Sequence, residues 1–174
     1  MERSDINPDT VDNWGRTPFS RAAENGLERT VRMLLERNDV NPGAADKSGR
    51  TPLSWAAENG HEGIVKILLE RNGVNPDMVD QSGRTPLSWA AGRGRVGIVK
   101  MLLGRNDVDP NMADGSGRMP MSWAVTSGYA GVVRLLQERC DLTARSALKE
   151  GPPEPFPIES AELPNPPFKK IRRF

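Results

Sequence analysis

The sequence contains very few of the residues that build catalytic or metal sites. Its 174 residues include one Cys and one His. The single Cys140 cannot form a disulfide within the chain, which favours a reducing compartment. His61 and Cys140 are too few for a four-ligand zinc site and form no recognisable nucleophile–base pattern. We therefore predict no catalytic, cofactor-binding or metal-binding residues and a protein that is not an enzyme.

The chain also lacks a charge excess and long hydrophobic runs. Lys and Arg number 24 against 23 Asp and Glu, a formal net charge of +1, so no broad field attracts nucleic acid or an anionic membrane. The apolar runs are far shorter than the roughly 20 residues of a membrane-spanning helix. Residues 1–5 carry no apolar stretch of the kind found in secretory signals. We expect a soluble, cytoplasmic monomer that binds neither nucleic acid nor a membrane.

The hydrophobic fraction is modest as well. At 36%, it is low for a globule with one central core. An elongated molecule, in which each unit is covered only by its neighbours, needs fewer apolar residues. The composition therefore favours stacked units over a compact domain.

What the sequence does contain is a repeat. Gly-Arg-Thr-Pro-Leu-Ser-Trp-Ala-Ala begins at Gly49 and again at Gly83, and variants of it begin at Gly15 and Gly117. The spacing is 34 residues in all three intervals, and residues 51–84 match 85–118 at 23 of 34 positions. A fixed period of this length indicates a repeat protein.

Each unit predicts two short helices and a long loop. Thr51 suits a helix N-cap and Pro52 the first helical position, so residues 53–57 should form a first helix. Gly60 stands where a left-handed helix stop is expected, and the apolar face of residues 64–69 predicts a second helix. Neither helix is long enough to be stable alone in water, so the units must stack. The predicted fold class is all-α, a solenoid of helix–turn–helix units with long loops.

These residues resemble the ankyrin repeat. The pattern that runs from Asp46 through Gly-Arg-Thr-Pro-Leu-Ser-Trp-Ala-Ala to Leu69 recurs in register over residues 2–143. The resemblance implies a non-catalytic module for protein–protein interaction. One departure from the family is that its usual His is replaced by Ser, so the hydrogen bonding there must differ; the positions are Ser20, Ser54, Ser88 and Ser122.

The domain boundaries follow from the repeat. We predict a partial repeat end at 1–14, repeats at 15–48, 49–82 and 83–116, and a terminal repeat at 117–143. Residues 144–174 are predicted to be a Pro-rich disordered tail with a basic end.

The ends of the array leave two alternatives open. The first and last units replace apolar residues of the middle units with polar ones, at Arg21, Thr30 and Gln137. Such changes fit capping repeats of a self-contained protein, and they equally fit decay in a gene remnant. The Leu-Ser-Trp-Ala-Ala run resembles the ankyrin arrays of filamentous fungi, which often lie at the C-terminal ends of large signalling ATPases.

Two side chains recur with the repeat. Trp55, Trp89 and Trp123 could form a stacking platform, but the sequence favours core packing between units. The second recurring side chain is an Arg, and we predict that each pairs with the Asp four residues earlier. These residues are Arg16, Arg50, Arg84 and Arg118 with Asp12, Asp46, Asp80 and Asp114.

The resemblance also implies a binding face. Partners of the family usually dock on the concave side formed by loop tips and first helices. By position that face here includes Trp14, Glu24, Lys47, Glu58, Gln81, Arg93, Gly115 and Thr126. Trp14 replaces a Ser of the later units, and it is either a binding anchor or a cover for the end of the stack. The identity of the protein partner cannot be read from these residues.

A second functional hypothesis rests on the basic end of the tail. Lys169, Lys170, Arg172 and Arg173 resemble a nuclear import signal. In that case the chain would be a nuclear regulatory protein whose repeats bind a transcription factor. A third hypothesis is a truncated piece of a larger fungal signalling ATPase.

Overall fold

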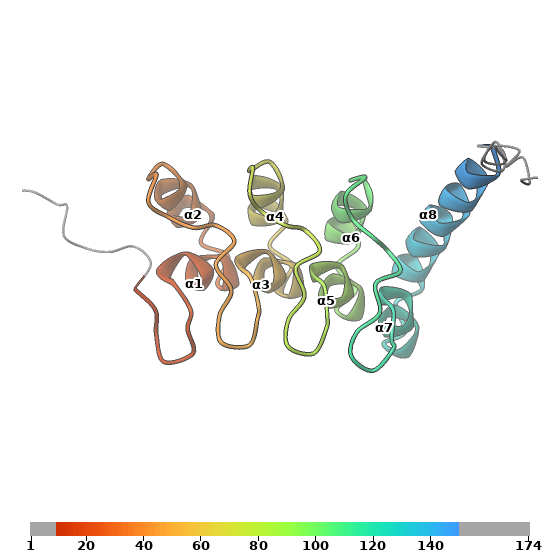
Figure 1. Ribbon diagram of the computed structural model, residues 1–174, viewed down its shortest axis with the longest axis horizontal. Helices are drawn as coiled ribbons and strands as arrows, with labels where there is room; N and C mark the ends of the chain where they lie inside the picture. The colour runs from red at the N-terminus through yellow and green to blue at the C-terminus, as the bar shows by residue number, and fades with distance from the viewer. Residues whose placement is uncertain (1–9, 150–174) are drawn as a thin grey trace, which may run out of the picture.

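A computed structural model describes residues 10–149, and the side chains of residues 10–142. Within that range the chain forms helices only, in four consecutive pairs. The pairs stand side by side in chain order, as Figure 1 shows, and this confirms the predicted all-α solenoid. The helices are α1 (Pro18–Glu24), α2 (Glu28–Leu35), α3 (Pro52–Asn59), α4 (Glu62–Leu69), α5 (Pro86–Gly92), α6 (Val96–Leu103), α7 (Pro120–Thr126) and α8 (Ala130–Lys149).

The first helix of each pair begins as the sequence predicts. The Thr51 hydroxyl accepts a hydrogen bond from the backbone N–H of Ser54, and Pro52 occupies the first helical turn. The Ser54 hydroxyl lies 3.1 Å from that of Thr51 and is fully buried. Thr17 and Thr85 cap α1 and α5 in the same way. The Ser that replaces the family's His therefore bonds to the cap of its own repeat.

The last repeat lacks this cap. Met119 precedes α7 with the same extended backbone, but no side chain bonds to the helix start. We expect Met119→Thr to raise the free energy of unfolding by about 1 kcal/mol, because it supplies the missing acceptor. The control is Met119→Val, because valine has nearly the same shape as threonine but lacks the hydroxyl. If urea denaturation gives the two variants the same stability, the cap is not what the last repeat lacks.

Hydrogen bonds from side chains to backbone carbonyls join successive repeats at the start and at the end of their second helices. At the start, an imidazole nitrogen of His61 lies 2.9 Å from the carbonyl oxygen of Glu24. The Arg95 side chain donates to the carbonyl of Glu58 at 3.0 Å. At the end, Arg105 donates to the carbonyl of Leu69 at 2.7 Å. Each bond joins residues 36 or 37 positions apart, so it fixes one unit on the next.

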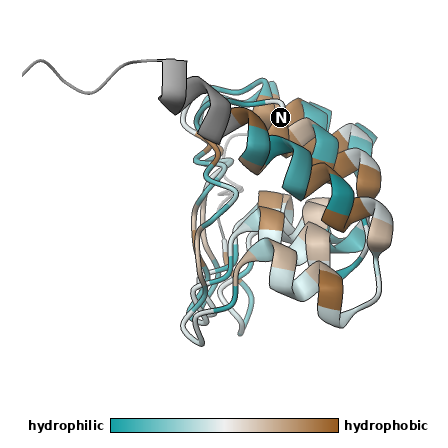
Figure 2. Cartoon of the chain, turned by 90° about the vertical axis from the view of Figure 1, so that its right-hand side faces the viewer, coloured by the Kyte–Doolittle hydropathy of each residue, from teal (hydrophilic) through white to brown (hydrophobic). Residues whose placement is uncertain are grey.

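The hydrophobic core runs along the stack between the two rows of helices. The inner row is α1, α3, α5 and α7, and the outer row is α2, α4, α6 and α8. The inner helices α1, α3 and α5 contribute one large residue and two alanines each, such as the fully buried Leu53, Ala56 and Ala57, whereas α7 contributes Ala124. Outer helices contribute a branched set such as Val65 and Leu68. Viewed from the end of the stack, the long loops lie to one side of both rows (Figure 2).

The last helix is longer than the sequence predicts. The other outer helices have 8 residues, whereas α8 has 20 and continues six residues past the expected boundary at 143. The reason lies in the stop signal, since the earlier outer helices are followed by Asn, Gly or Pro within a few residues. After Leu135 no Gly or Pro occurs until Gly151, and Ala, Leu, Arg and Lys favour continuation. Residues 144–149 are thus helical, and the rest of the predicted tail lies outside the described residues.

Candidate functional site

The loop between successive repeats ends in a tight turn, which we call a finger. The four fingers are residues 12–16, 46–50, 80–84 and 114–118. In the third finger, the Oδ1 atom of Asp80 accepts hydrogen bonds from the backbone N–H groups of Ser82 and Arg84, at 2.8 and 3.0 Å. Gly83 completes the turn with a positive φ of 76°, which favours glycine. The Asp at the start of each finger therefore closes its own turn.

The fingers are joined to one another through their backbones. Lys47 N–H donates to the carbonyl of Trp14 at 2.9 Å, and Gln81 N–H donates to the carbonyl of Ser48 at 2.9 Å. Gly115 N–H donates to the carbonyl of Ser82 at 2.8 Å. All four fingers thus form one continuous ribbon along the stack, which holds their tips in fixed positions.

Each finger is also bound to the inner helix that follows it. The indole N–H of Trp89 donates to the second carboxylate oxygen of Asp80 at 3.1 Å. Trp55 and Trp123 make the same bond to Asp46 and Asp114, each at 3.0 Å. These three carboxylates are buried, with exposed fractions of 6 to 8%. A buried carboxylate needs hydrogen-bond donors, and the indole N–H adds a third to the two backbone N–H groups of the finger.

Arginines from the fingers stack between the tryptophan rings. The Arg50 guanidinium carbon lies 3.4 Å from the ring centroid of Trp55 and 4.1 Å from that of Trp89. Arg84 lies 3.5 Å from the centroid of Trp89 and 5.7 Å from that of Trp123. Cations over indole faces at these distances are attracted by the ring. We call this row, Arg50, Arg84 and Arg118 with Trp55, Trp89 and Trp123, the Arg–Trp ladder.

The ladder corrects the prediction that the tryptophans pack in the core. All three are half-buried, and none belongs to the buried core. The position does lie on the side of the inner helix that meets the finger, but a guanidinium, rather than the apolar core, fills the space beside each ring. The sequence showed that Arg and Trp recur five residues apart, and this spacing was the signal for the ladder.

The predicted Arg–Asp pairs form in three fingers out of four. Arg16 lies 3.1 Å from Asp12, and two later pairs are longer, 3.5 Å for Arg84 and 3.6 Å for Arg118. Arg50 is the exception, since its guanidinium pairs with Glu58 at the end of α3.

Glu58 is held by arginines from two repeats. It accepts hydrogen bonds from Arg50 of its own repeat and from Arg93 of the next, the latter at 2.7 Å. Burial by itself raises the pKa of Glu58, but the hydrogen bonds and charges of Arg93 and Arg50 outweigh it and leave the pKa below its usual value. The glutamate is therefore ionised at neutral pH and joins two repeats.

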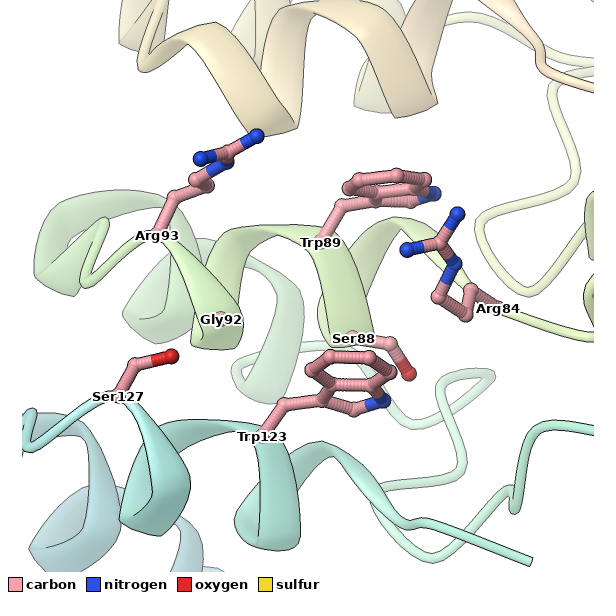
Figure 3. A pocket seen from close by; sticks show the side chains of 7 residues that line it. All are labelled: Arg84, Ser88, Trp89, Gly92, Arg93, Trp123 and Ser127. Carbon is pink, nitrogen blue, oxygen red and sulfur yellow. The ribbon is translucent and has the colours of Figure 1, made fainter. Parts of the chain in front are cut away.

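This pairing changes along the array. In the first repeat Glu24 takes the place of Glu58 and pairs with Arg16 at 3.2 Å. The equivalent residues of the third and fourth repeats are Gly92 and Thr126, neither of which carries a charge. Beside Gly92 lies a cavity of about 230 Å³, which Figure 3 shows between α5 and α7. The residues that line it are Arg84, Ser88, Trp89, Gly92, Arg93, Trp123 and Ser127.

The partner-binding residues predicted from the sequence are placed as follows. Trp14 is 64% exposed at the tip of the first finger. Lys47 and Gln81 are exposed on the next two fingers, where the Gln81 amide donates to the Lys47 carbonyl at 2.7 Å. Thr126 is exposed on α7 and donates to the carbonyl of Ser122. Gly115 lies on the fourth finger, and Glu24 of α1 pairs with Arg16.

Two of the predicted residues bind each other. Glu58 and Arg93 form the inter-repeat pair described above, so they stabilise the stack in addition to facing outward. The basic residues Lys169, Lys170, Arg172 and Arg173 lie outside the described part of the chain. Sequence reasoning missed that Gly92 and Ser127 line a cavity, and the only signal was their departure from the Glu58 and Arg93 of the preceding repeat.

The comparisons with known proteins identify the family of the chain. Among residues 10–149 no cluster of His, Cys, Asp or Glu could hold a metal ion, and no helix is long and apolar enough to cross a membrane. A search of curated proteins finds no match, so the likeness to fungal arrays stays a prediction. The family model described as ankyrin repeats (3 copies) matches residues 2–80 and 64–146. Ankyrin repeats generally mediate protein–protein interaction, and proteins built from them are typically non-catalytic. Since these matches cover most of its length, the chain belongs to the ankyrin-repeat family.

Proposed function

We propose that the chain is a non-catalytic interaction module whose protein partner docks on the finger face. This face is the surface formed by the four fingers and the inner helices α1, α3, α5 and α7 (Figure 1). Its membership of the ankyrin-repeat family supports a protein partner. The observation that carries the choice of face is Trp14, a large aromatic side chain presented at the tip of a fixed finger.

Trp14 has the properties of a binding anchor. Its indole is 64% exposed, while its backbone N–H donates to Asp12 at 2.9 Å and its carbonyl accepts from Lys47 at 2.9 Å. The Arg16 guanidinium lies 4.7 Å from the ring centroid and supports one side of the indole. Because the backbone is already fixed, little ordering entropy is lost when a partner covers the ring. Exposed Trp and Arg side chains are the residues that most often dominate binding energy.

The finger ribbon favours a partner that spans several repeats. The backbone bonds between fingers set the tips of successive repeats in a continuous line. A protein that contacts Trp14 can then reach Lys47 and Gln81 without any rearrangement of the array.

The test is affinity capture with the full-length chain. Trp14→Ala should weaken binding of the captured partner roughly 30-fold, the effect of losing a 2 kcal/mol hot spot. Met33→Ala is the matched control, because Met33 is 60% exposed on α2 of the outer row, away from the fingers. Binding affinities that stay equal in the wild type and Trp14→Ala, or that fall equally in Met33→Ala, would remove the finger face as the docking surface.

A further inference from the structure

The second and third repeats differ at one point of the Arg–Trp ladder. In the second repeat, Glu58 lies between the finger arginine Arg50 and the next repeat's Arg93, and it pairs with both. The equivalent residues of the third repeat are Arg84, Gly92 and Ser127. The guanidinium and both flanking rings are retained, while the carboxylate and the second arginine are replaced by small residues.

The cavity of about 230 Å³ lies where this replacement occurs. In Figure 3, Gly92 and Ser127 lie on the same side of the Trp123 ring, while the Arg84 guanidinium lies beside Trp89 on the other side. A Cβ atom added to Gly92 would lie 3.6 Å from the Cβ of Trp123, an ordinary contact. The cavity therefore corresponds to the space that a glutamate side chain takes in the repeat before it.

Arg84 and Arg93 are the charged groups that line this cavity, and Arg93 already pairs with Glu58. The Nε atom of Arg84 is buried and has no hydrogen-bond partner, as is also true of the Nε atom of Arg50. The carboxylate nearest to Arg84 is Asp80, 3.5 Å away, and that group already accepts three hydrogen bonds, from Ser82, from the backbone of Arg84 and from Trp89. Arg50, by contrast, hydrogen-bonds a carboxylate of its own repeat. An additional acceptor beside Arg84 would thus form the charge-assisted hydrogen bond that the second repeat makes internally.

We propose that this cavity binds a glutamate or aspartate side chain of the partner protein. The proposal rests on the proposed function, because the cavity opens between two helices of the finger face. The incoming carboxylate pairs with the Arg84 guanidinium. Its methylene stem packs against the Trp123 ring. The second repeat demonstrates the chemistry, since its own Glu58 makes the equivalent contacts with Arg50 and Arg93.

A carboxylate fits this site better than the phosphates of a nucleic acid. A nucleic-acid strand needs a track of uncompensated positive charge along the surface. Here the finger aspartates lie next to the ladder arginines, at 3.5 Å in the third finger and 3.6 Å in the fourth. The formal charge of the whole chain is only +1. One guanidinium within an otherwise balanced row matches a single acidic side chain.

The first experiment supplies the carboxylate within the chain. Gly92 has an ordinary helical backbone, so Gly92→Glu and Gly92→Gln should both fold. Gly92→Glu should melt roughly 2–4 °C above Gly92→Gln at neutral pH, because only the carboxylate pairs with Arg84. The gap should close in high salt. Equal melting temperatures would overturn the proposal, because they would mean that the cavity does not favour a carboxylate.

The second experiment adds the carboxylate from outside. The capped peptide acetyl-Gly-Gly-Glu-Gly-Gly-amide is titrated into the full-length protein while the indole N–H resonances are recorded by NMR. The resonances of Trp89 and Trp123 should shift, and that of Trp55 should not, because Glu58 already occupies the equivalent place. The Gln peptide should bind roughly tenfold more weakly. Gly92→Glu should abolish the shifts.

Three results of the titration would overturn the proposal. These are no shift, equal shifts at Trp55, or equal shifts with the Gln peptide. A single-stranded oligothymidylate is run in parallel, and if it shifts the same indoles at lower concentration than the Glu peptide, the site is one for nucleic acid instead. These outcomes are independent of the capture experiment. If Trp14→Ala loses the partner but the peptide does not bind, the proposed docking face is supported and the proposed carboxylate site is refuted.

Discussion

Replacing Arg50 with methionine should lower the free energy of unfolding by about 3–4 kcal/mol, whereas the same change at Arg84 should cost only about 1 kcal/mol. Both side chains stack on tryptophan rings of the Arg–Trp ladder, with guanidinium carbons 3.4 and 3.5 Å from the nearest centroid. Methionine keeps most of the apolar stem and removes the charge. The difference in unfolding free energy between the two variants therefore measures how much each guanidinium contributes through its other partners.

Arg50 holds a buried carboxylate. Its pairing partner Glu58 has only 12% of its side chain exposed, and Arg50 itself is 8% exposed. Without Arg50 the glutamate depends on Arg93 alone, whose side chain is 57% exposed and hydrated. Leaving a buried charge with half of its partners is more costly than losing a surface pair. Arg84 has no equivalent glutamate, and its own partner Asp80, 3.5 Å away, keeps three hydrogen bonds from Ser82, Arg84 N–H and Trp89 when the guanidinium is removed.

A double variant and a pH series check the reason for the loss. Arg50→Met/Glu58→Leu should recover part of the stability, because the stranded charge is gone. In the native protein the pKa of Glu58 lies below its usual value, through the hydrogen bonds and charges that outweigh its burial. The stability that Glu58 contributes is therefore present above its ordinary pKa and is lost as the pH falls through the lowered value. The difference between wild type and Arg50→Met in urea denaturation should shrink accordingly in acid. A constant difference would show that stacking, and not the pairing with Glu58, sets the cost.

The contrast between these two arginines marks the limit of what the sequence could predict. The sequence predicted features that depend on local backbone preference, namely the Thr51 cap and the Gly60 stop within each 34-residue period. The structure confirms the cap, since the Thr51 side chain bonds to the helix start, and it confirms the stop, since Gly60 has a φ of 87°. Such preferences depend on neighbours in the chain, which a single sequence shows directly. The helix pairs and their order followed from them.

Contacts between repeats could not be predicted in this way. Glu58 meets Arg93 across 35 positions, and both were predicted to face a partner rather than each other. The five-residue spacing of Arg and Trp recurs in the sequence, but it does not show how far the arginine side chain reaches over the helix. The cavity beside Gly92 arises from the loss of two side chains in neighbouring repeats, so it is visible only once both repeats are stacked. The sequence therefore predicts the units well and the surface between them poorly.

The finger aspartates should be among the most sensitive residues of the array, and Asp80→Ala should destabilise the protein by about 3 kcal/mol. Asp80 is 6% exposed and accepts N–H donors from Ser82, from Arg84 and from the Trp89 indole. Alanine would leave these donors without an acceptor and would release the finger that carries the ribbon bond from Ser82 to Gly115. Because each unmet buried donor costs about 1 kcal/mol or more, the loss should approach their sum.

Asp80→Asn distinguishes the contribution of the turn hydrogen bonds from that of the indole hydrogen bond. Its amide oxygen can still accept from the finger N–H groups, but its NH₂ group meets the Trp89 N–H, which is also a donor. We expect a loss of about 1.5 kcal/mol and a shifted Trp89 indole resonance. Asp12→Asn is the matched control, since the first repeat carries Arg21 where the others carry Trp, and Asp12 binds no indole. If Asp12→Asn costs as much as Asp80→Asn, the indole bond does not stabilise the finger on its helix. A smaller loss in Asp12→Asn, with an unchanged Trp89 signal, would identify the Asp–Trp bond as the contact that holds each finger against the inner helix beneath it.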